Sequence, residues 1–149
     1  MPTIEESVLI ERPVCDVFAY MADGNNATVY DASVVLSARE GAGETGVGTR
    51  WRGATKVLGR DFGWVSECIL FERDRHLTIR AVQGKLPFEI VMTFAPEARG
   101  TCFCYRLTVD SGLGGVFGKL AEPLVVRSQT RTVRASLATL KELLESHSE

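Results

Sequence analysis

The sequence lacks a long hydrophobic run: none of its apolar stretches approaches the roughly 20 residues that a membrane-spanning helix needs. Residues 1–6 also lack the basic and apolar segments of a signal peptide. Net charge is small, because 17 lysines and arginines nearly balance 19 aspartates and glutamates, and the arginines are scattered from Arg12 to Arg134. Such a chain offers no electrostatic footprint to a nucleic acid or an anionic membrane. We therefore expect a cytoplasmic protein with no nucleic-acid partner and no integral membrane association.

Signals for metals and disulfides are also scarce. The cysteines are Cys15, Cys68, Cys102 and Cys104. They contain no C-x-x-C pair, and the two histidines, His76 and His147, are not spaced as partner ligands. In a cytosolic chain we expect reduced thiols rather than disulfides. The sequence therefore predicts no metal site.

Two glycine-rich segments resemble phosphate-binding loops without fulfilling their requirements. Residues 41–46 match G-x-G-x-x-G, but that motif needs a following helix to receive a pyrophosphate, and residues 49–52 continue as a strand. We interpret this segment as a flexible hairpin loop at the mouth of a cavity. The cluster from Gly112 to Gly118 lacks the first glycine of a phosphate loop, and Leu120 stands where Ser or Thr should follow Lys119. We interpret it as a mobile gate before the last helix, and no cofactor is predicted.

The length and composition predict a single domain over residues 1–149. The chain is 45% hydrophobic and 24% charged, and no repeat, low-complexity tract or linker divides it. A chain of this length removes about 68–70% of its unfolded surface from water, so its core needs no metal or disulfide. An interior cavity is compatible with a core of this size.

Hydrophobic periodicity predicts the order strand, helix, six strands, long helix. Residues 3–11 form the first strand, and Pro13 starts a short amphipathic helix with Val17, Phe18 and Met21 on its apolar face. A polar stretch with room for another helical turn then leads to Tyr30. The six strands are expected at 33–38, 49–57, 61–71, 77–82, 88–94 and 101–109. Their short connections make them antiparallel.

The last third of the chain predicts one long helix. Its apolar stripe consists of Val126, Val133, Leu137, Leu140 and Leu144. Pro123 interrupts the first turns, so we expect either a kink there or a helix that begins at this proline.

One hairpin can be predicted at the level of residue pairs. A turn at residues 59–60 pairs Leu58 with Asp61 and sets the register of both strands. The resulting pairs are Trp51–Cys68, Gly53–Ser66, Thr55–Trp64, Val57–Phe62 and, on the other face, Arg52–Glu67. Because charge belongs in water, the face with the two tryptophans points inward. A one-residue slip would mix the two faces, so the register is a testable prediction.

The same alternation predicts the inner face of the remaining strands. Its residues are Leu77, Ile79, Ala81, Phe88, Ile90, Met92, Phe94, Phe103, Tyr105 and Leu107. Cys102 and Cys104 fall on the outer face. The inner face combines large aromatics with small or polar residues, so its side chains either fill the space or leave it hollow. Two tryptophans and a tyrosine whose polar tips need partners favour a partly wet cavity.

Four local segments, in this order and spacing, resemble a known family. They are residues 11–18, Gly46-Val47-Gly48-Thr49, Phe94-Ala95-Pro96 with Gly100-Thr101, and residues 137–145. The sequence resembles the START-like, or SRPBCC, superfamily with the helix-grip fold, in particular its polyketide cyclase/dehydrase-like branch. Tyr30 stands where many relatives have a tryptophan. The resemblance implies an α+β fold in which a seven-stranded antiparallel sheet wraps around the long C-terminal helix, with short helices after the first strand.

The resemblance also implies an apolar cavity between sheet and long helix, which the superfamily uses for lipids, sterols, polyketides and hormones. Our leading hypothesis is therefore a protein that binds a hydrophobic or amphipathic small molecule, and the fold alone implies no reaction. The candidate ligand-binding residues are Tyr30, Trp51, Thr55, Trp64, Ser66, Phe88, Met92, Tyr105 and Leu120. Each of these side chains also fits an alternative interpretation as an ordinary residue of the core that contacts no ligand.

Two other classes of function stay open. A cyclase/aromatase-like enzyme would bend a poly-β-ketone in the cavity, with Tyr105 and Ser66 as candidates to polarise its carbonyls. Against this, the pattern puts Glu67 and Glu89 outside, places His76 in a solvated turn, and leaves the inner face short of His, Asp, Glu and Arg. A partner-binding module without a ligand would use the 102–104 strand or the arginine side of the last helix. The sequence leaves open whether the protein forms a homodimer.

Overall fold

The computed structural model describes the backbone of residues 3–109 and 115–146 and the side chains of residues 3–109 and 123–146. Within these ranges the chain forms a seven-stranded antiparallel sheet in the order β1-β7-β6-β5-β4-β3-β2, with helices in addition. The elements are β1 (Thr3–Ile10), α1 (Val14–Ala22), the 3-10 turn η1 (Gly24–Asn26), α2 (Ala27–Tyr30), β2 (Val34–Glu40), β3 (Arg50–Val57), β4 (Arg60–Glu72), β5 (His76–Gly84), β6 (Phe88–Glu97), β7 (Gly100–Val109) and α3 (Gly115–Ser146).

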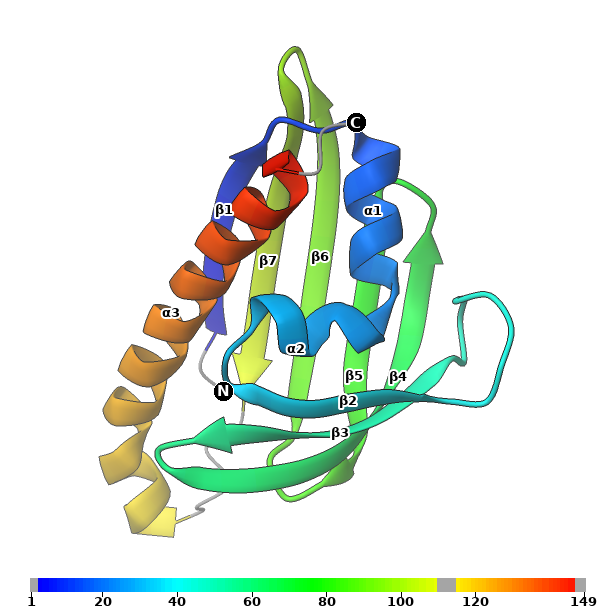
Figure 1. Cartoon of the computed structure of the whole chain (residues 1–149). Helices are drawn as coiled ribbons and strands as arrows, with labels where there is room; N and C mark the ends of the chain where they lie inside the picture. Colours follow the sequence, from blue (N-terminus) through cyan, green and yellow to red (C-terminus); the bar gives the residue numbers. More distant parts are fainter. Residues whose placement is uncertain (1–2, 110–114, 147–149) are drawn as a thin grey trace.

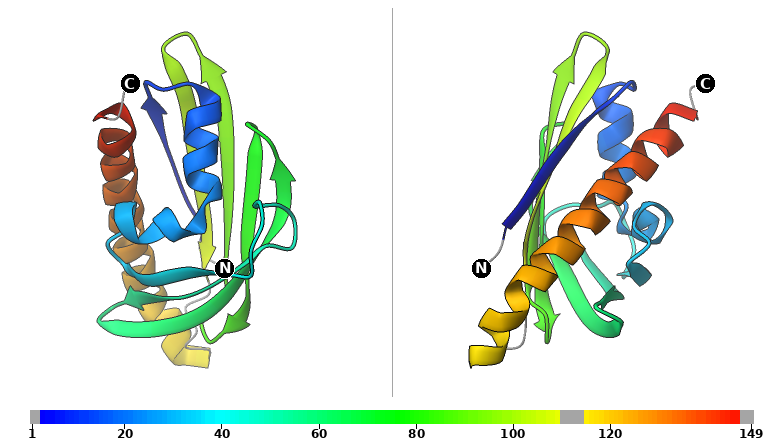
Figure 2. Two further views of the ribbon diagram at one scale, coloured as in Figure 1. Left: turned by 45° about the vertical axis from the view of Figure 1, so that its right-hand side comes forward. Right: turned by 90° about the vertical axis from the view of Figure 1, so that its left-hand side faces the viewer.

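The helices lie against the inner face of the sheet (Figure 1). From β2 to β7 each strand pairs with the next one in the sequence, and β1 closes the order by pairing with β7. Figure 2 shows that α1 and α2 lie on the same side of the sheet and that the β2–β3 end curls around beneath them. The predicted helix-grip α+β fold is confirmed.

The α1 helix fills the inner face at one end of the sheet. Pro13 precedes its first turn with φ −58°, as the fixed φ of proline allows. Phe18 is buried and makes edge-to-face contacts with Phe71 and Phe94, with ring centroids 5.2 and 5.0 Å apart. Phe94 in turn lies 5.1 Å from the ring of Phe103. This end of the sheet is therefore a closed aromatic core.

The long helix differs from its prediction in two respects. It begins at Gly115 and continues through Pro123, so a start at the proline is wrong. The buried stripe contains Val133, Leu137, Leu140 and Leu144 as predicted, but its first member is Val125 and not Val126. Val125, the buried Gln129 and Val133 follow one another at a helical spacing of four residues. The prediction used apolar residues only, so it passed over the polar Gln129 and started the stripe at Val126.

The β3–β4 hairpin turns one residue earlier than predicted. Leu58 and Gly59 occupy the turn with φ of 50° and 80°, and Val57 pairs with Arg60. A two-residue turn of this kind needs positive φ at both central positions, and glycine supplies the second one at no steric cost. The observed pairs are Trp51–Ser66, Gly53–Trp64, Thr55–Phe62 and Arg50–Glu67.

The whole register is thus displaced by two residues, so the predicted pairs are wrong. A displacement by two keeps every side chain on its face, and both tryptophans still point inward. The predicted pair Arg52–Glu67 is replaced by two other ion pairs on the outer face. Arg50 lies 2.7 Å from Glu67, and Arg52 lies 3.0 Å from Glu40.

The C-terminal end of α3 is fixed to the end of β1 and to the connection between β1 and α1. Lys141 Nζ donates to the backbone carbonyl of Leu9 at 2.8 Å, and the carboxylate of Glu145 accepts from the backbone N–H of Glu11 at 2.8 Å. In the other direction Arg12 donates to the carbonyl of Leu144 at 3.2 Å. These contacts, the α3 clamp, hold the long helix against the edge of the sheet.

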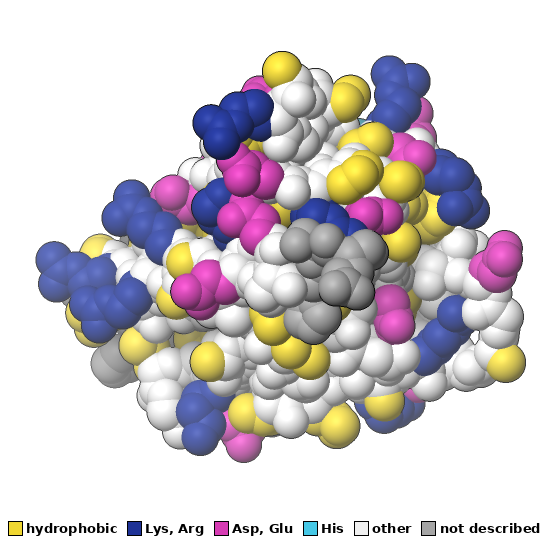
Figure 3. All heavy atoms as spheres, turned by 45° about the horizontal axis from the view of Figure 1, so that its top comes forward, with side chains coloured by type: hydrophobic (Ala, Val, Ile, Leu, Met, Phe, Trp, Pro, Cys, Tyr) yellow, Lys and Arg dark blue, Asp and Glu magenta, His cyan; other side chains and the backbone are white. Residues whose placement is uncertain are grey.

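The outer surface carries charges of both signs. Lysine and arginine side chains alternate with aspartate and glutamate over the face drawn in Figure 3. Cys102 and Cys104 lie on the outer face, where their residues pair with Leu9 and Ser7 of β1, and every cysteine is a free thiol. In the part of the chain that the structure describes, no helix combines the length and apolarity needed to cross a membrane.

Candidate functional site

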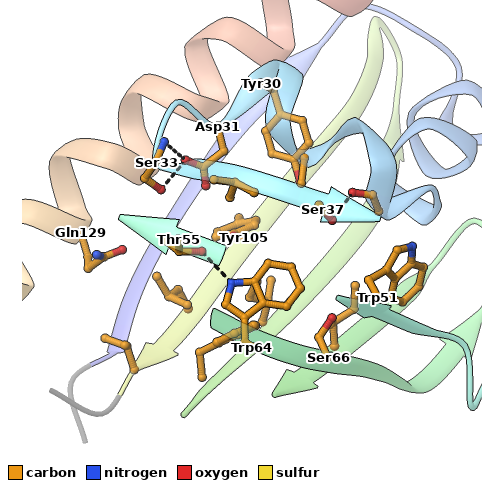
Figure 4. A pocket seen from close by; sticks show the side chains of 18 of the residues that line it. Tyr30, Asp31, Ser33, Ser37, Trp51, Thr55, Trp64, Ser66, Tyr105 and Gln129 are labelled. Carbon is orange, nitrogen blue, oxygen red and sulfur yellow. Dashed lines mark hydrogen bonds between the residues drawn. The ribbon is translucent and has the colours of Figure 1, made fainter. Parts of the chain in front are cut away.

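A cavity of about 110 Å³ lies between the inner face of the sheet, α2 and α3 (Figure 4). The predicted ligand-binding residues whose side chains are described all line it: Tyr30, Trp51, Thr55, Trp64, Ser66, Phe88, Met92 and Tyr105. Leu120 belongs to α3, but its side chain lies outside the described residues. Strand alternation brings together the residues of this set that lie on β3, β4, β6 and β7, because it directs them to one face of the sheet, and Tyr30 is added by α2.

Aromatic rings form one wall of the cavity. Trp64 and Phe88 meet edge to face with ring centroids 5.6 Å apart. The indole N–H of Trp64 donates to Thr55 Oγ1 at 2.9 Å, which satisfies the polar tip of this side chain. Gly53 leaves room for the ring, since a Cβ there would lie 2.5 Å from Trp64 Cη2. The wall is therefore fixed in position by its own contacts.

The other large indole has a different environment. Trp51 is 2% exposed, and among the described residues nothing accepts a hydrogen bond from its Nε1. Gly24 of η1 covers this nitrogen so closely that a Cβ on Gly24 would lie 2.5 Å from it. An unpartnered buried N–H costs about 1–3 kcal/mol. The hydrogen bond that holds η1 at this end comes instead from the Ser37 hydroxyl, which donates to the carbonyl of Gly24 at 2.8 Å.

The polar end of the cavity is built around Asp31, which follows α2. Its Oδ1 accepts from the backbone N–H of Ser33 at 2.9 Å and from the Ser33 hydroxyl at 2.6 Å. Burial raises the pKa of the Asp31 carboxyl, and hydrogen bonds from Ser33 and from Ser136 of α3 offset part of that rise. Gln129 of α3 lines the cavity at the same end.

Two tyrosine hydroxyls complete this end. Burial raises the pKa of Tyr30 and that of Tyr105 well above the ordinary value. The negative charge of Asp31 adds to both shifts, so the three groups lie within electrostatic range of one another. Both hydroxyls therefore stay protonated at neutral pH and can donate hydrogen bonds into the cavity.

Asp31 corrects a prediction made from the sequence. The inner face was expected to be short of acidic groups, and that remains true of the strands, where Glu67 pairs with Arg50 and Glu89 lies 3.8 Å from Arg80. The carboxyl in the cavity comes instead from the connection between α2 and β2. A signal for it exists in the sequence, because an Asp two residues before a Ser is typical of an Asx turn at the end of a helix.

His76 was also misplaced. It is the first residue of β5 and not part of a solvated turn. Its ring is half-buried, with Nε2 3.2 Å from the hydroxyl of Thr78 and Nδ1 3.8 Å from the carboxylate of Glu72. It does not line the cavity.

The first glycine-rich segment, residues 41–46, lies outside the cavity lining. Arg39 holds the 41–48 loop through its guanidinium, which donates to the carbonyls of Gly43 and Glu44. None of the loop residues lines the cavity. Gly112 and Gly114 lie outside the described residues, whereas Gly118 and Lys119 belong to α3. Over the described ranges, no three His, Cys, Asp or Glu side chains are grouped so that they could hold a metal ion.

Comparison with solved structures finds the same fold in proteins of low sequence identity. TTHA0849 from Thermus thermophilus is 22% identical, with 99% of this chain and 100% of that chain covered and a TM-score of 0.85. The ZhuI aromatase/cyclase from a Streptomyces species is 14% identical over 99% of this chain and 96% of that one, with a TM-score of 0.82. A START superfamily protein from Mycobacterium smegmatis is 13% identical over 97% of each chain, with a TM-score of 0.73.

A search of curated proteins finds no match. Residues 1–145 match the protein family described as "Polyketide cyclase / dehydrase and lipid transport". The match spans nearly the whole sequence and agrees with the fold of the similar structures. The chain therefore belongs to the polyketide cyclase/dehydrase and lipid transport family.

Proposed function

We propose that the protein binds a hydrophobic or amphipathic small molecule in the cavity between the sheet and α3. The observation that carries this proposal is a cavity of about 110 Å³ with an aromatic wall at Trp64 and Phe88 and a polar end at Asp31. Protein interiors are ordinarily packed so closely that few voids exceed a water molecule. A cavity of this size with polar groups at one end does not stabilise the fold. A ligand-binding function accounts for it.

The volume also indicates the size of the ligand. Pockets for drug-sized molecules measure about 300–1,000 Å³, so we expect a compact ligand and not a long acyl chain. Enclosing about 300 Å² of apolar ligand surface contributes roughly 7 kcal/mol at about 25 cal/mol/Å² before ordering costs. After those costs we expect affinities around micromolar or weaker.

A cavity-filling variant tests this proposal. Ile90 lines the cavity, whereas its neighbour Val91 points to the outer face of β6. We expect Ile90→Trp to abolish binding of compact hydrophobic molecules, measured by native mass spectrometry and thermal shift, and Val91→Trp to leave it intact. Circular dichroism checks that both variants fold. Binding that survives in a folded Ile90→Trp variant, or a broad panel without any bound compound, would overturn the proposal.

Cyclase-like catalysis is the second candidate function, and the polar end of the cavity favours it. A carboxyl with a raised pKa beside two protonated tyrosines offers a proton acceptor and hydrogen-bond donors for a developing oxyanion. The similar ZhuI structure is that of an aromatase/cyclase.

The test for this second function is turnover of a poly-β-ketone, followed as loss of water by mass spectrometry. We expect Tyr105→Phe or Ser66→Ala to reduce turnover while binding is kept. If the wild-type protein binds the ketone and releases no water beyond the uncatalysed rate, the binding function stands and catalysis is rejected.

A further inference from the structure

Asp31 differs from every other described residue of the cavity lining because it alone has a carboxyl group. The described lining residues include no lysine, arginine or histidine. The groups that face Asp31 are neutral on each element packed against it: Tyr30 on α2, Tyr105 on β7, and Gln129 and Ser136 on α3. The carboxyl thus has no cationic partner among the described residues of the cavity.

All the groups that donate hydrogen bonds to the carboxyl are neutral. The hydroxyl and the backbone N–H of Ser33 donate to Oδ1, and the Ser136 hydroxyl and the backbone N–H of Val34 also donate to this carboxyl. Figure 4 shows the side chain beside Ser33 at the α2–β2 connection, and Asp31, Tyr30 and Tyr105 all line the cavity. Neutral dipoles alone therefore surround the carboxyl at the polar end of the cavity, and no cation balances it among the described residues there.

These surroundings favour the binding of some ligand head groups over others. A hydroxyl or an amine on the ligand donates a hydrogen bond to the carboxylate and compensates its burial. A carboxylate on the ligand brings a second acidic group into the same poorly solvated space, where two like charges disfavour each other. The aromatic wall is the same for all of these ligands, so the head group decides between them.

We propose that Asp31 makes this cavity selective for compact hydrophobic molecules that end in an uncharged or cationic hydrogen-bond donor, an alcohol or an amine, and excludes carboxylates. The inference rests on the proposed binding function and defines the class of ligand that this site takes. Asp31 is therefore a specificity-determining residue. The ligands that it selects have in common a group that donates a hydrogen bond to its carboxyl.

Four probes with one carbon skeleton test the selectivity: benzyl alcohol, benzylamine, benzoate and toluene. Dissociation constants are measured at pH 7.5 by tryptophan fluorescence and native mass spectrometry. We expect the wild-type protein to bind the alcohol and the amine at least about tenfold more tightly than the benzoate, a difference of about 1.4 kcal/mol. Preference for the alcohol over the amine, or the reverse, identifies which of the two donors the site takes.

The variant Asp31→Asn removes the charge and keeps an acceptor oxygen for Ser33. We expect it to bind the benzoate at least about threefold more tightly and the amine more weakly, with the toluene unchanged. Asp61→Asn, an exposed position at the start of β4, is the matched control and leaves all four affinities as they are.

The outcomes separate the two proposals. If the toluene and the alcohol bind but the benzoate binds equally well in the wild-type protein, the selectivity is wrong and the binding function stands. If Asp31→Asn folds and keeps the wild-type ranking, Asp31 is not the cause and the inference also fails. If none of the four probes binds, the proposed binding function fails together with the inference. The wild-type ranking alone decides the selectivity should Asp31→Asn not fold.

Discussion

The inner face of the sheet has two regions that differ in what covers them. Beneath α1 the space is filled, and we call this region the packed half, defined by Phe18, Phe71, Phe94 and Phe103. Beneath α2 it is open, and we call this region the hollow half, defined by Asp31, Trp64, Phe88 and Tyr105. The strands β6 and β7 run through both halves with the same alternation.

The difference shows that alternation decides which face a side chain occupies, whereas the covering helix decides whether the space is filled. The α1 helix is nine residues long and inserts Phe18 between the rings of Phe71 and Phe94. The α2 helix has four residues and ends in Tyr30, followed by Asp31. A single turn brings too few apolar side chains to fill its half, and the polar groups at its end line the space instead.

The largest expected effect comes from opening the packed half. Phe103 is fully buried, so Phe103→Ala loses its transfer free energy and leaves a new void. We expect the free energy of unfolding, measured by urea denaturation, to fall by about 3–5 kcal/mol. In the hollow half Phe88 is half-buried beside an existing cavity, so Phe88→Ala should cost at most about 2 kcal/mol. Equal losses in the two variants would contradict the comparison.

A smaller effect is expected from adding one methyl group to the hollow half. In Gly24→Ala the new Cβ would lie 2.5 Å from Trp51 Nε1, and the buried indole cannot move away freely. We expect a loss of about 1–3 kcal/mol in the free energy of unfolding. Gly46→Ala is the matched control, because a Cβ there meets no atom within 4 Å. The control should change stability by no more than about 0.5 kcal/mol, and a stable Gly24→Ala variant would show that η1 does not rest on Trp51.

Asp31 gives the hollow half a pH dependence that the packed half lacks. Because its pKa is raised, the folded state binds the proton more readily than the unfolded chain, whose Asp has an ordinary pKa of 3.8. Its contribution to stability is therefore greatest below that value and is lost as the pH rises through the raised pKa, by about 1.4 kcal/mol per pH unit in between. We expect Asp31→Asn to be more stable than the wild type at pH 7 in urea titrations. The gain should vanish near pH 3.5, and a gain that is independent of pH would contradict the raised pKa.

The smallest effect is expected on the outer face, away from both halves. Arg50 and Glu67 are 2.7 Å apart, but their side chains are 45% and 25% exposed. We expect Glu67→Gln to lower the free energy of unfolding by less than about 1 kcal/mol. Repeating the urea titration in 1 M salt should reduce the difference further, because salt screens exposed charges. A larger effect that persists in salt would mean that this pair supports the hairpin more than its exposure indicates.

The sequence predicted the faces of the strands well because alternation is a local property. Phe88, Met92 and Tyr105 were placed on the inner face by alternation, and Trp64 because charged residues occupy the other face of its hairpin. All four line the cavity. The register of one hairpin failed because it depends on where a turn accepts positive φ, and Leu58 adopts φ 50° against the preference of its side chain.

The most informative residue of the site was missed for a different reason. Asp31 lies between α2 and β2, where neither the helical nor the strand period applies. Its spacing from Ser33 indicates an Asx turn but does not indicate that the side chain lines a cavity. The buried Gln129 of α3 was missed because a polar residue interrupts an apolar stripe. Residues that give a cavity its chemistry break the periodic patterns by which a core is found.

The α3 clamp has a consequence for the order in which the chain assembles. The hairpins from β2 to β7 join segments that are close in sequence, whereas the Lys141–Leu9 and Glu145–Glu11 contacts span 132 and 134 residues. Closing so long a loop costs entropy that local hairpins avoid, and contacts of high sequence separation slow folding. We expect the meander of six strands to form first and β1 and α3 to dock last. Weakening the α3 clamp would then accelerate unfolding and leave the folding rate nearly unchanged. The α3 clamp therefore sets the lifetime of the folded state.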